Sequence, residues 1–203
     1  MELTTGDLLA RAAELAAGPS RKILGITGPP GAGKSTLAEL LVARLGPRRA
    51  ALASMDGFHI GDALLVESGK RDRKGAPDTF DQAGYAAALA RLRQADHVVY
   101  LPKFERDRED STAAAIAVPP DVPLIVTEGN YLLVWPEVHD QLNQTWYLDV
   151  PTAARQERLI RRRIELGADE ALAQHWATGS DETNARTIAA SRELADLVLV
   201  WRW

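Results

Sequence analysis

The sequence has 203 residues, of which 46% are hydrophobic and 26% charged, a composition typical of a globular chain. Lys and Arg number 24 and Asp and Glu 28, so the net charge of −4 argues against nucleic-acid binding through bulk charge. Cysteine is absent, which excludes disulfides and thiolate metal sites and fits a reducing compartment. We therefore expect a cytoplasmic protein, and the length favours one domain over residues 1–203.

The first 18 residues predict an amphipathic helix that packs on the core. Apolar side chains recur there at helical spacing, Thr4 and Asp7 form a capping pair, and Gly18-Pro19 ends the helix. Acidic and basic residues are mixed with the apolar ones, so the segment is not a signal peptide. No stretch of the chain approaches the ~18 consecutive apolar residues of a membrane helix, and no membrane partner is expected.

The remaining chain alternates between strand and helix patterns. Short apolar runs predict strands at 21–27, 50–55, 97–102, 122–128, 146–150 and 197–201, and Pro102 is expected to end the third. Helical periodicity predicts helices at 34–45, near 61–67, and at 82–94, about 151–166, 168–177 and 181–191. This alternation predicts an α/β fold with a mostly parallel sheet of about five or six strands and helices on both faces.

Residues 28–36, GPPGAGKST, match the phosphate-binding pattern G-x-x-x-x-G-K-[ST] and lie between an apolar strand and an amphipathic helix. The glycines permit positive φ, and the backbone N–H groups with the helix dipole form an anion cradle. Lys34 is expected to reach the β- and γ-phosphates, and the Ser35 hydroxyl to ligate Mg²⁺. The predicted nucleotide-binding residues are Gly28, Gly31, Ala32, Gly33, Lys34, Ser35 and Thr36.

Other motifs narrow the class of nucleotide-binding protein. The N-K-x-D motif of GTPases and the LSGGQ-like signature of transporter ATPases are both absent from the sequence. An ATP-dependent kinase with a small-molecule acceptor remains. The alternatives are a nucleotide-binding regulatory protein and an NTPase that needs no acceptor.

Two carboxylates follow predicted strands, at the sheet edge where α/β proteins bind ligands. Asp56, in Met55-Asp56-Gly57-Phe58-His59, is expected to orient and deprotonate an acceptor hydroxyl or to hold Mg²⁺ through water. The alternative is a structural Asp-Gly turn. Glu128, in TEGNY after PLIV, is expected to bind Mg²⁺ or the acceptor, or else to cap the next turn. We expect the strand before Asp56 to neighbour the strand before the phosphate loop.

An Arg-rich helix, RQERLIRRRIE, begins at Arg155. Arg155, Arg158 and Arg162 share one face at spacing i, i+3, i+7, while Ile160 and Ile164 point away and are expected to be buried. Arginines on a mobile lid stabilise the charge of a phosphoryl-transfer transition state. The alternative is a solvated charged face.

Six strings, in this order, resemble the phosphoribulokinase/uridine kinase family from about residue 20 to the C-terminus: GPPGAGKST, MDGFH, RKGAPDTFD, LPKFERDRED, TEGNYLLV and ERLIRRRIELG. They are most similar to bacterial nucleoside-kinase-like and fructose-transport-associated kinases, which are related to type I pantothenate kinase. The resemblance implies a three-layer fold of the P-loop NTPase type, with an Arg-rich helical lid at about 151–180. It also implies the substrate ATP and the metal Mg²⁺.

The resemblance also implies roles for individual residues. Asp56 is the catalytic carboxylate near the acceptor hydroxyl, Ser35 and Glu128 help to hold Mg²⁺, and Arg158 and Arg162 belong to the lid. His59, Lys74 and Arg106 lie in or near the acceptor pocket.

The acceptor and the oligomeric state stay open. Uridine kinases carry a D-S-F-Y-like string where this chain has Asp56-Gly-Phe-His59, so the acceptor is a uridine-like nucleoside, a sugar-type alcohol or a pantothenate-type acid. The basic segment Lys70-Arg-Asp-Arg-Lys74 is either a flap that meets ATP or an anionic acceptor, or a solvated loop. The sequence is compatible with a homodimer.

Overall fold

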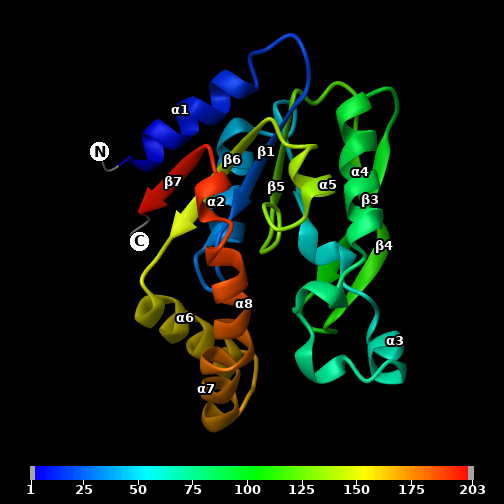
Figure 1. Cartoon of the computed structure of the whole chain (residues 1–203). Helices are drawn as coiled ribbons and strands as arrows, with labels where there is room; N and C mark the ends of the chain where they lie inside the picture. Colours follow the sequence, from blue (N-terminus) through cyan, green and yellow to red (C-terminus); the bar gives the residue numbers. More distant parts are fainter. Residues whose placement is uncertain (1–2, 201–203) are drawn as a thin grey trace.

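A computed structural model describes residues 3–200. Its centre is a five-stranded sheet, whose place in the fold is seen in Figure 1. The strands are β1 (Lys22–Thr27), β2 (Ala50–Ser54), β5 (Leu124–Glu128), β6 (Gln144–Asp149) and β7 (Leu197–Val200). Their order is β2-β5-β1-β6-β7, and every neighbouring pair is parallel. The predicted parallel sheet is confirmed; Trp201, the last residue of the sixth predicted strand, lies outside the described residues.

Helices cover both faces of this sheet. Consecutive strand residues point to opposite faces, so Ile23 joins one buried cluster and Leu24 the other. The Leu24 cluster is closed by α1 (Thr5–Leu15) and α2 (Lys34–Leu45), and the Ile23 cluster by α4 (Gln82–Gln94), the short α5 (Pro136–His139) and α8 (Ser180–Ala189). The predicted N-terminal helix is confirmed, with a capping box between Thr4 and Asp7.

The predicted strand at 97–102 is not part of the main sheet, which corrects our expectation. It is β3 (Val99–Glu105), and it pairs antiparallel with β4 (Asp110–Val118), a strand that the Ala-rich segment did not predict. Pro102 does not end β3, because the register shifts between Leu101 and Lys103 and the pairing resumes beyond it. A proline lacks an N–H for the ladder and is tolerated at such an irregularity.

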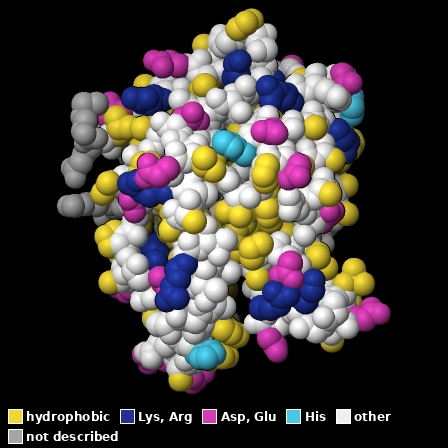
Figure 2. All heavy atoms as spheres, viewed as in Figure 1, with side chains coloured by type: hydrophobic (Ala, Val, Ile, Leu, Met, Phe, Trp, Pro, Cys, Tyr) yellow, Lys and Arg dark blue, Asp and Glu magenta, His cyan; other side chains and the backbone are white. Residues whose placement is uncertain are grey.

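Two lobes extend beyond the carboxyl ends of the sheet strands (Figure 1). One contains α6 (Thr152–Glu165), α7 (Glu170–Thr178) and α8, and the other contains α3 (Asp62–Glu67) and the loops around it. The space-filling view shows a notch between the two lobes (Figure 2). Within residues 3–200, no helix combines the length and apolar character needed to span a bilayer.

Candidate active site

The phosphate loop joins β1 to α2, and its backbone has the shape that anion binding requires. Gly28, Gly31 and Gly33 have φ values of 143°, 78° and 91°, in the region that favours glycine. Ala32 is buried and donates its N–H to the Pro29 carbonyl at 3.1 Å. The N-terminus of α2 therefore opens onto the loop with no side-chain cap, which leaves its N–H groups for an anion.

Lys34 lies folded over this loop. Its Nζ donates hydrogen bonds to the carbonyls of Gly28 at 2.8 Å and Pro29 at 3.1 Å, and its side chain is buried. Burial lowers the pKa of Lys34 to about 8, although the negative charges of Glu128 and Asp56 act in the opposite direction. The ammonium is therefore held in a poorly hydrated position where an added anion gains a strong interaction.

The lowered pKa predicts that ATP binding takes up protons. Below pH 8 Lys34 is already protonated; above it the free protein has lost that proton, and bound phosphates restore it by raising the pKa. ATP affinity should then fall as the pH rises through about 8. Calorimetric titration at pH 8.5 in two buffers of different ionisation enthalpy should show uptake in the wild type and less in Lys34→Ala; equal uptake in both would exclude Lys34 as the source.

Glu128 connects the phosphate loop to the turn that carries Asp56. Its buried carboxylate accepts hydrogen bonds from the hydroxyls of Ser35 at 3.2 Å and Ser54 at 2.5 Å. Ser54 ends β2, and its Oγ also accepts the backbone N–H of Asp56 at 3.2 Å. A Cβ on Gly129 would lie 2.5 Å from Met55, so glycine is needed where the two strand ends meet.

We expected the strand before Asp56 to neighbour β1. This expectation was wrong, because β5 lies between β1 and β2. The phosphate loop and the Asp56 turn are therefore separated by two strand spacings of ~4.8 Å each, which leaves room for Glu128 between them. Asp56 lies in a 3₁₀ turn, Met55–Phe58, with its carboxylate partly exposed. It forms an ion pair with Arg106, in the bend between β3 and β4, at 3.8 Å.

The side-chain oxygens of Ser35, Glu128 and Asp56 are ligands that fit Mg²⁺. Burial and the negative charge of Asp56 raise the pKa of Glu128, whereas the Ser54 hydroxyl, Lys34 and Ser35 lower it in part. A divalent cation would relieve the repulsion between the two carboxylates. Among the described residues no cluster of three His, Cys, Asp or Glu forms a complete metal cage. A few hard oxygen ligands, completed by phosphate oxygens and water, are the environment Mg²⁺ prefers.

Helix α6 packs against the phosphate loop through its arginines. Arg155 is buried and donates to the Pro30 carbonyl at 3.2 Å, and Arg158 donates to the Gly31 carbonyl at 3.4 Å. Arg162 keeps part of its surface open to solvent, but the surrounding lobe desolvates its guanidinium and lowers its pKa, and the charges of Arg106 and Arg163 lower it further. One face of α6 is therefore turned toward the site.

The opposite face of α6 is not buried, which corrects our expectation. Ile164 is 42% exposed, and with Ala153 and Ile160 it lines a shallow apolar depression on the surface. The buried apolar residue of α6 is Leu159, which lies beside the phosphate loop.

His59 follows Asp56 and is held by aromatic rings. The ring centroids of Phe80 and Phe104 lie 4.0 and 4.8 Å from its own, and Nδ1 lies 2.8 Å from the Asp56 carbonyl. Burial lowers the pKa of His59, so its ring is neutral at pH 7. A neutral ring that donates Nδ1–H to the carbonyl keeps Nε2 as an acceptor.

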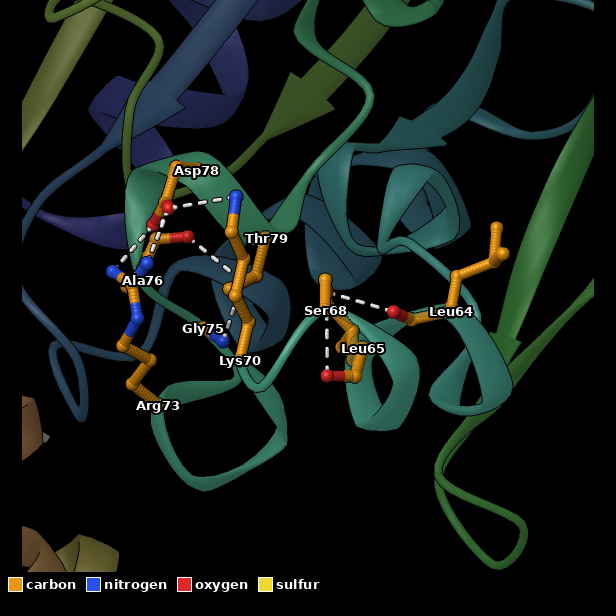
Figure 3. A network of polar contacts seen from close by, with 9 residues as sticks. All are labelled: Leu64, Leu65, Ser68, Lys70, Arg73, Gly75, Ala76, Asp78 and Thr79. Atoms are coloured by element: carbon orange, nitrogen blue, oxygen red, sulfur yellow. Dashed lines mark hydrogen bonds and ion pairs between the residues drawn. The ribbon is translucent and has the colours of Figure 1, made fainter.

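The basic segment 70–74 is neither a free flap nor a simply solvated loop, because its cations pair with carboxylates. Lys70 and Arg73 meet Asp78 at 3.1 and 2.5 Å (Figure 3). Arg71 and Lys74 both pair with Asp62, and Lys74 also lies over the Phe104 ring. The local positive charge is therefore largely compensated within the lobe that contains α3.

Thr36, the last residue of the phosphate-loop motif, is exposed in the first turn of α2. The structure thus brings Lys34, Ser35, Asp56, Glu128 and Arg106 to one edge of the sheet, and α6 adds Arg158 and Arg162.

Several known proteins are related to this chain in sequence, and a solved structure has the same fold. The uncharacterized protein YggC of Escherichia coli is 30% identical over 187 residues, which cover 88% of this chain and 77% of YggC. A candidate uridine kinase of Schizosaccharomyces pombe is 30% identical over 209 residues, 95% of this chain and 88% of that protein. The crystal structure of a candidate fructose transport system kinase from Silicibacter sp. TM1040 is 35% identical, with a TM-score of 0.88 over 98% of this chain and 100% of that one.

The chain belongs to the phosphoribulokinase/uridine kinase family of P-loop kinases. No protein-family model matches it. A pantothenate kinase of Corynebacterium glutamicum is also related, at 27% identity over 182 residues that span 85% of this chain but 58% of that enzyme. Family membership makes this protein a phosphotransferase of the P-loop kinase type and leaves the acceptor open.

Sequence reasoning for this P-loop kinase missed Ser54 and did not foresee the burial of Arg155. Ser54 was not singled out, although its position at the end of a strand, two residues before Asp56, is a usable signal. Arg155 was grouped with the lid, but it is 4% exposed and pairs with Glu182 at 3.2 Å. The period of the helix placed Arg155 on the correct face but could not show that α8 covers it.

Proposed function

We propose that this kinase transfers the γ-phosphate of ATP to a hydroxyl of a small acceptor, a uridine-like nucleoside or a sugar-type alcohol. The observation that carries the proposal is the Glu128 bridge, which ties Ser35 of the phosphate loop to the Ser54–Asp56 turn. The bridge supports a site with nucleotide phosphates on one side and a carboxylate for the acceptor on the other. A nucleotide-binding regulatory protein would not need Asp56 there.

In the proposed step, Asp56 orients the acceptor hydroxyl and accepts its proton. The hydroxyl oxygen forms a bond to the γ-phosphorus as the bond to the β–γ bridging oxygen breaks, and ADP leaves. The transition state is loose, so positioning and charge stabilisation contribute more than the strength of the base. The guanidinium of Arg106, 3.8 Å from the Asp56 carboxylate, places a positive charge beside this carboxylate.

The phosphate loop and α6 stabilise the charge on the transferred group. Lys34 leaves the Gly28 and Pro29 carbonyls to contact the β- and γ-phosphates, while Arg158 and Arg162 approach from α6. Ser35, Glu128 and Asp56 are the residues that would hold Mg²⁺, which when bound neutralises phosphate charge.

The acceptor side is formed by His59, Arg106 and Lys74. The His59 ring, with Nε2 free to accept, suits a hydroxyl-rich or nucleoside acceptor. A pantothenate-type acid is the second candidate, and Arg106 favours it, because this partly exposed guanidinium has room for a carboxylate of the acceptor.

An acceptor panel tests this function. ADP formation is measured with nucleosides, sugars and pantothenate, each against a blank without acceptor. We expect turnover with one acceptor class and little in the blank. Equal ADP formation with every acceptor and in the blank would indicate an NTPase that needs no acceptor. ATP binding without any turnover would favour a regulatory protein.

A lid role for Arg162 predicts a kinetic effect rather than a binding effect. Arg162→Ala should lower kcat by at least ~10-fold, because a lid arginine acts in the closed transition state, and change the ATP Kd by less than ~3-fold. Arg161→Ala is the matched control, since Arg161 lies on the apolar-depression side of α6. Arg163 serves less well, because it pairs with Asp181 at 2.6 Å and stacks on Trp176. Equal small effects at 161 and 162 would support a solvated face.

A further inference from the structure

The Gly75 carbonyl receives hydrogen bonds from two separate elements. The Tyr131 hydroxyl, in the segment after β5, donates at 2.6 Å, and the Asn184 amide of α8 donates at 3.2 Å. Both donor residues are buried, at 0% and 8% exposure. The position of this carbonyl is therefore set jointly by the end of the sheet and by α8.

The 75–80 loop, which starts at Gly75, is bonded to His59 and Ile60, the two residues that follow the turn carrying Asp56. The buried Thr79 accepts the Gly75 N–H on its hydroxyl at 3.0 Å and the Ile60 N–H on its carbonyl at 3.0 Å. Phe80 forms a β-bridge with His59. A displacement of the 75–80 loop therefore moves the acceptor side of the site.

Helix α8 is also attached to the phosphate loop. Glu182 pairs with Arg155 at 3.2 Å, and Arg155 donates to the Pro30 carbonyl at 3.2 Å. Glu182 and Asn184 are two residues apart, which places them about 200° apart around the helix. Helix α8 thus contacts the 75–80 loop directly through Asn184, and on another side it is linked to the phosphate loop through Arg155 of α6.

We propose that Asn184 is a positioning residue through which α8 couples nucleotide binding to the order of the 75–80 loop. The inference rests on the proposed function, since it takes ATP as the ligand of the phosphate loop. ATP fixes the loop that holds Arg155, Arg155 holds α8 through Glu182, and Asn184 passes this constraint to the Gly75 carbonyl. The acceptor side is then ordered when the nucleotide is present.

Hydrogen exchange of the 75–80 amides, with and without the ATP analogue AMP-PNP and Mg²⁺, tests this coupling without knowledge of the acceptor. Asn184→Leu and Tyr131→Phe each remove one donor to the same carbonyl. Each should speed exchange in the free protein by about 2- to 12-fold, the factor expected for one hydrogen bond. We expect AMP-PNP to slow exchange in the wild type and in Tyr131→Phe, but not in Asn184→Leu.

A second variant and a control complete the test. Glu182→Gln removes the charge from the link to Arg155 and should also weaken the nucleotide response, although it keeps Asn184. Thr187→Ala, whose hydroxyl bonds within α8, should respond as the wild type does.

Three outcomes would overturn the coupling. These are the same nucleotide response in Asn184→Leu as in Tyr131→Phe, a normal response in Glu182→Gln, and no slowing in wild-type protein that binds AMP-PNP. Failure of the wild type to bind AMP-PNP at all would contradict the proposed function as well, so the two failures are distinguishable.

Discussion

Asp56→Asn is expected to lower the acceptor-dependent kcat by ~10²–10⁴, the usual range for the loss of a general base. The substitution keeps the size of the side chain and most of its hydrogen bonds, but it removes the charge and the proton acceptor. The ATP Kd should change by less than ~3-fold, because the phosphate loop provides most of the nucleotide contacts. The measurements are steady-state kinetics with the identified acceptor and calorimetric titration with ATP.

The control for Asp56→Asn is Asp121→Asn. Asp121 is an exposed carboxylate that precedes β5, at the opposite end of that strand from Glu128. The Asp121→Asn substitution removes the same charge from the protein and should leave kcat unchanged. A structural Asp-Gly turn predicts the reverse pattern for Asp56→Asn: near-normal kcat and a stability loss of ~1 kcal/mol, seen as a lowered thermal midpoint.

Lys34→Ala is expected to lower kcat by at least ~10²-fold and to leave the fold intact, because it removes a preorganised charge at the transferred phosphate. Its thermal midpoint should not fall. A buried ammonium whose pKa is lowered to about 8 is held at a desolvation cost, and alanine removes that cost together with the two hydrogen bonds. Kinetics, circular dichroism and thermal unfolding measure these effects.

Lys22→Ala is the matched control for Lys34→Ala. Lys22 begins β1, whereas the phosphate loop follows the other end of that strand, so kcat should stay at the wild-type value. Wild-type turnover in Lys34→Ala would remove this lysine from the mechanism. A large loss of helix signal would instead assign it a structural role.

The sequence predicted the main sheet well because its strands are short apolar runs that alternate with amphipathic helices. It could not order them, since nothing local to residues 50–55 indicates that β5 inserts between β2 and β1. The β3–β4 hairpin was missed for a related reason: Ala113 to Ala115 carry little strand preference, and Pro102 suggested an end where the structure has a register shift.

For the site, motif and family resemblance selected residues that the structure places together, including Lys34, Ser35, Asp56 and Glu128. What they could not provide were contacts between segments distant in sequence. The Ser54–Glu128 hydrogen bond joins residues 74 positions apart, and the Asn184–Gly75 bond joins residues 109 apart. The catalytic roles of Lys34 and Asp56 stay predictions, which the variants described above test.

The most direct measurement follows the γ-phosphate itself. Phosphorus NMR of ATP, Mg²⁺, the protein and the acceptor that is active in the panel should show a phosphate-monoester signal growing as ADP forms in equal amount. Asp56→Asn should slow that signal by ~10²–10⁴ while the variant still binds ATP. Growth of inorganic phosphate in place of the ester, at a rate that does not depend on the acceptor, would contradict the account.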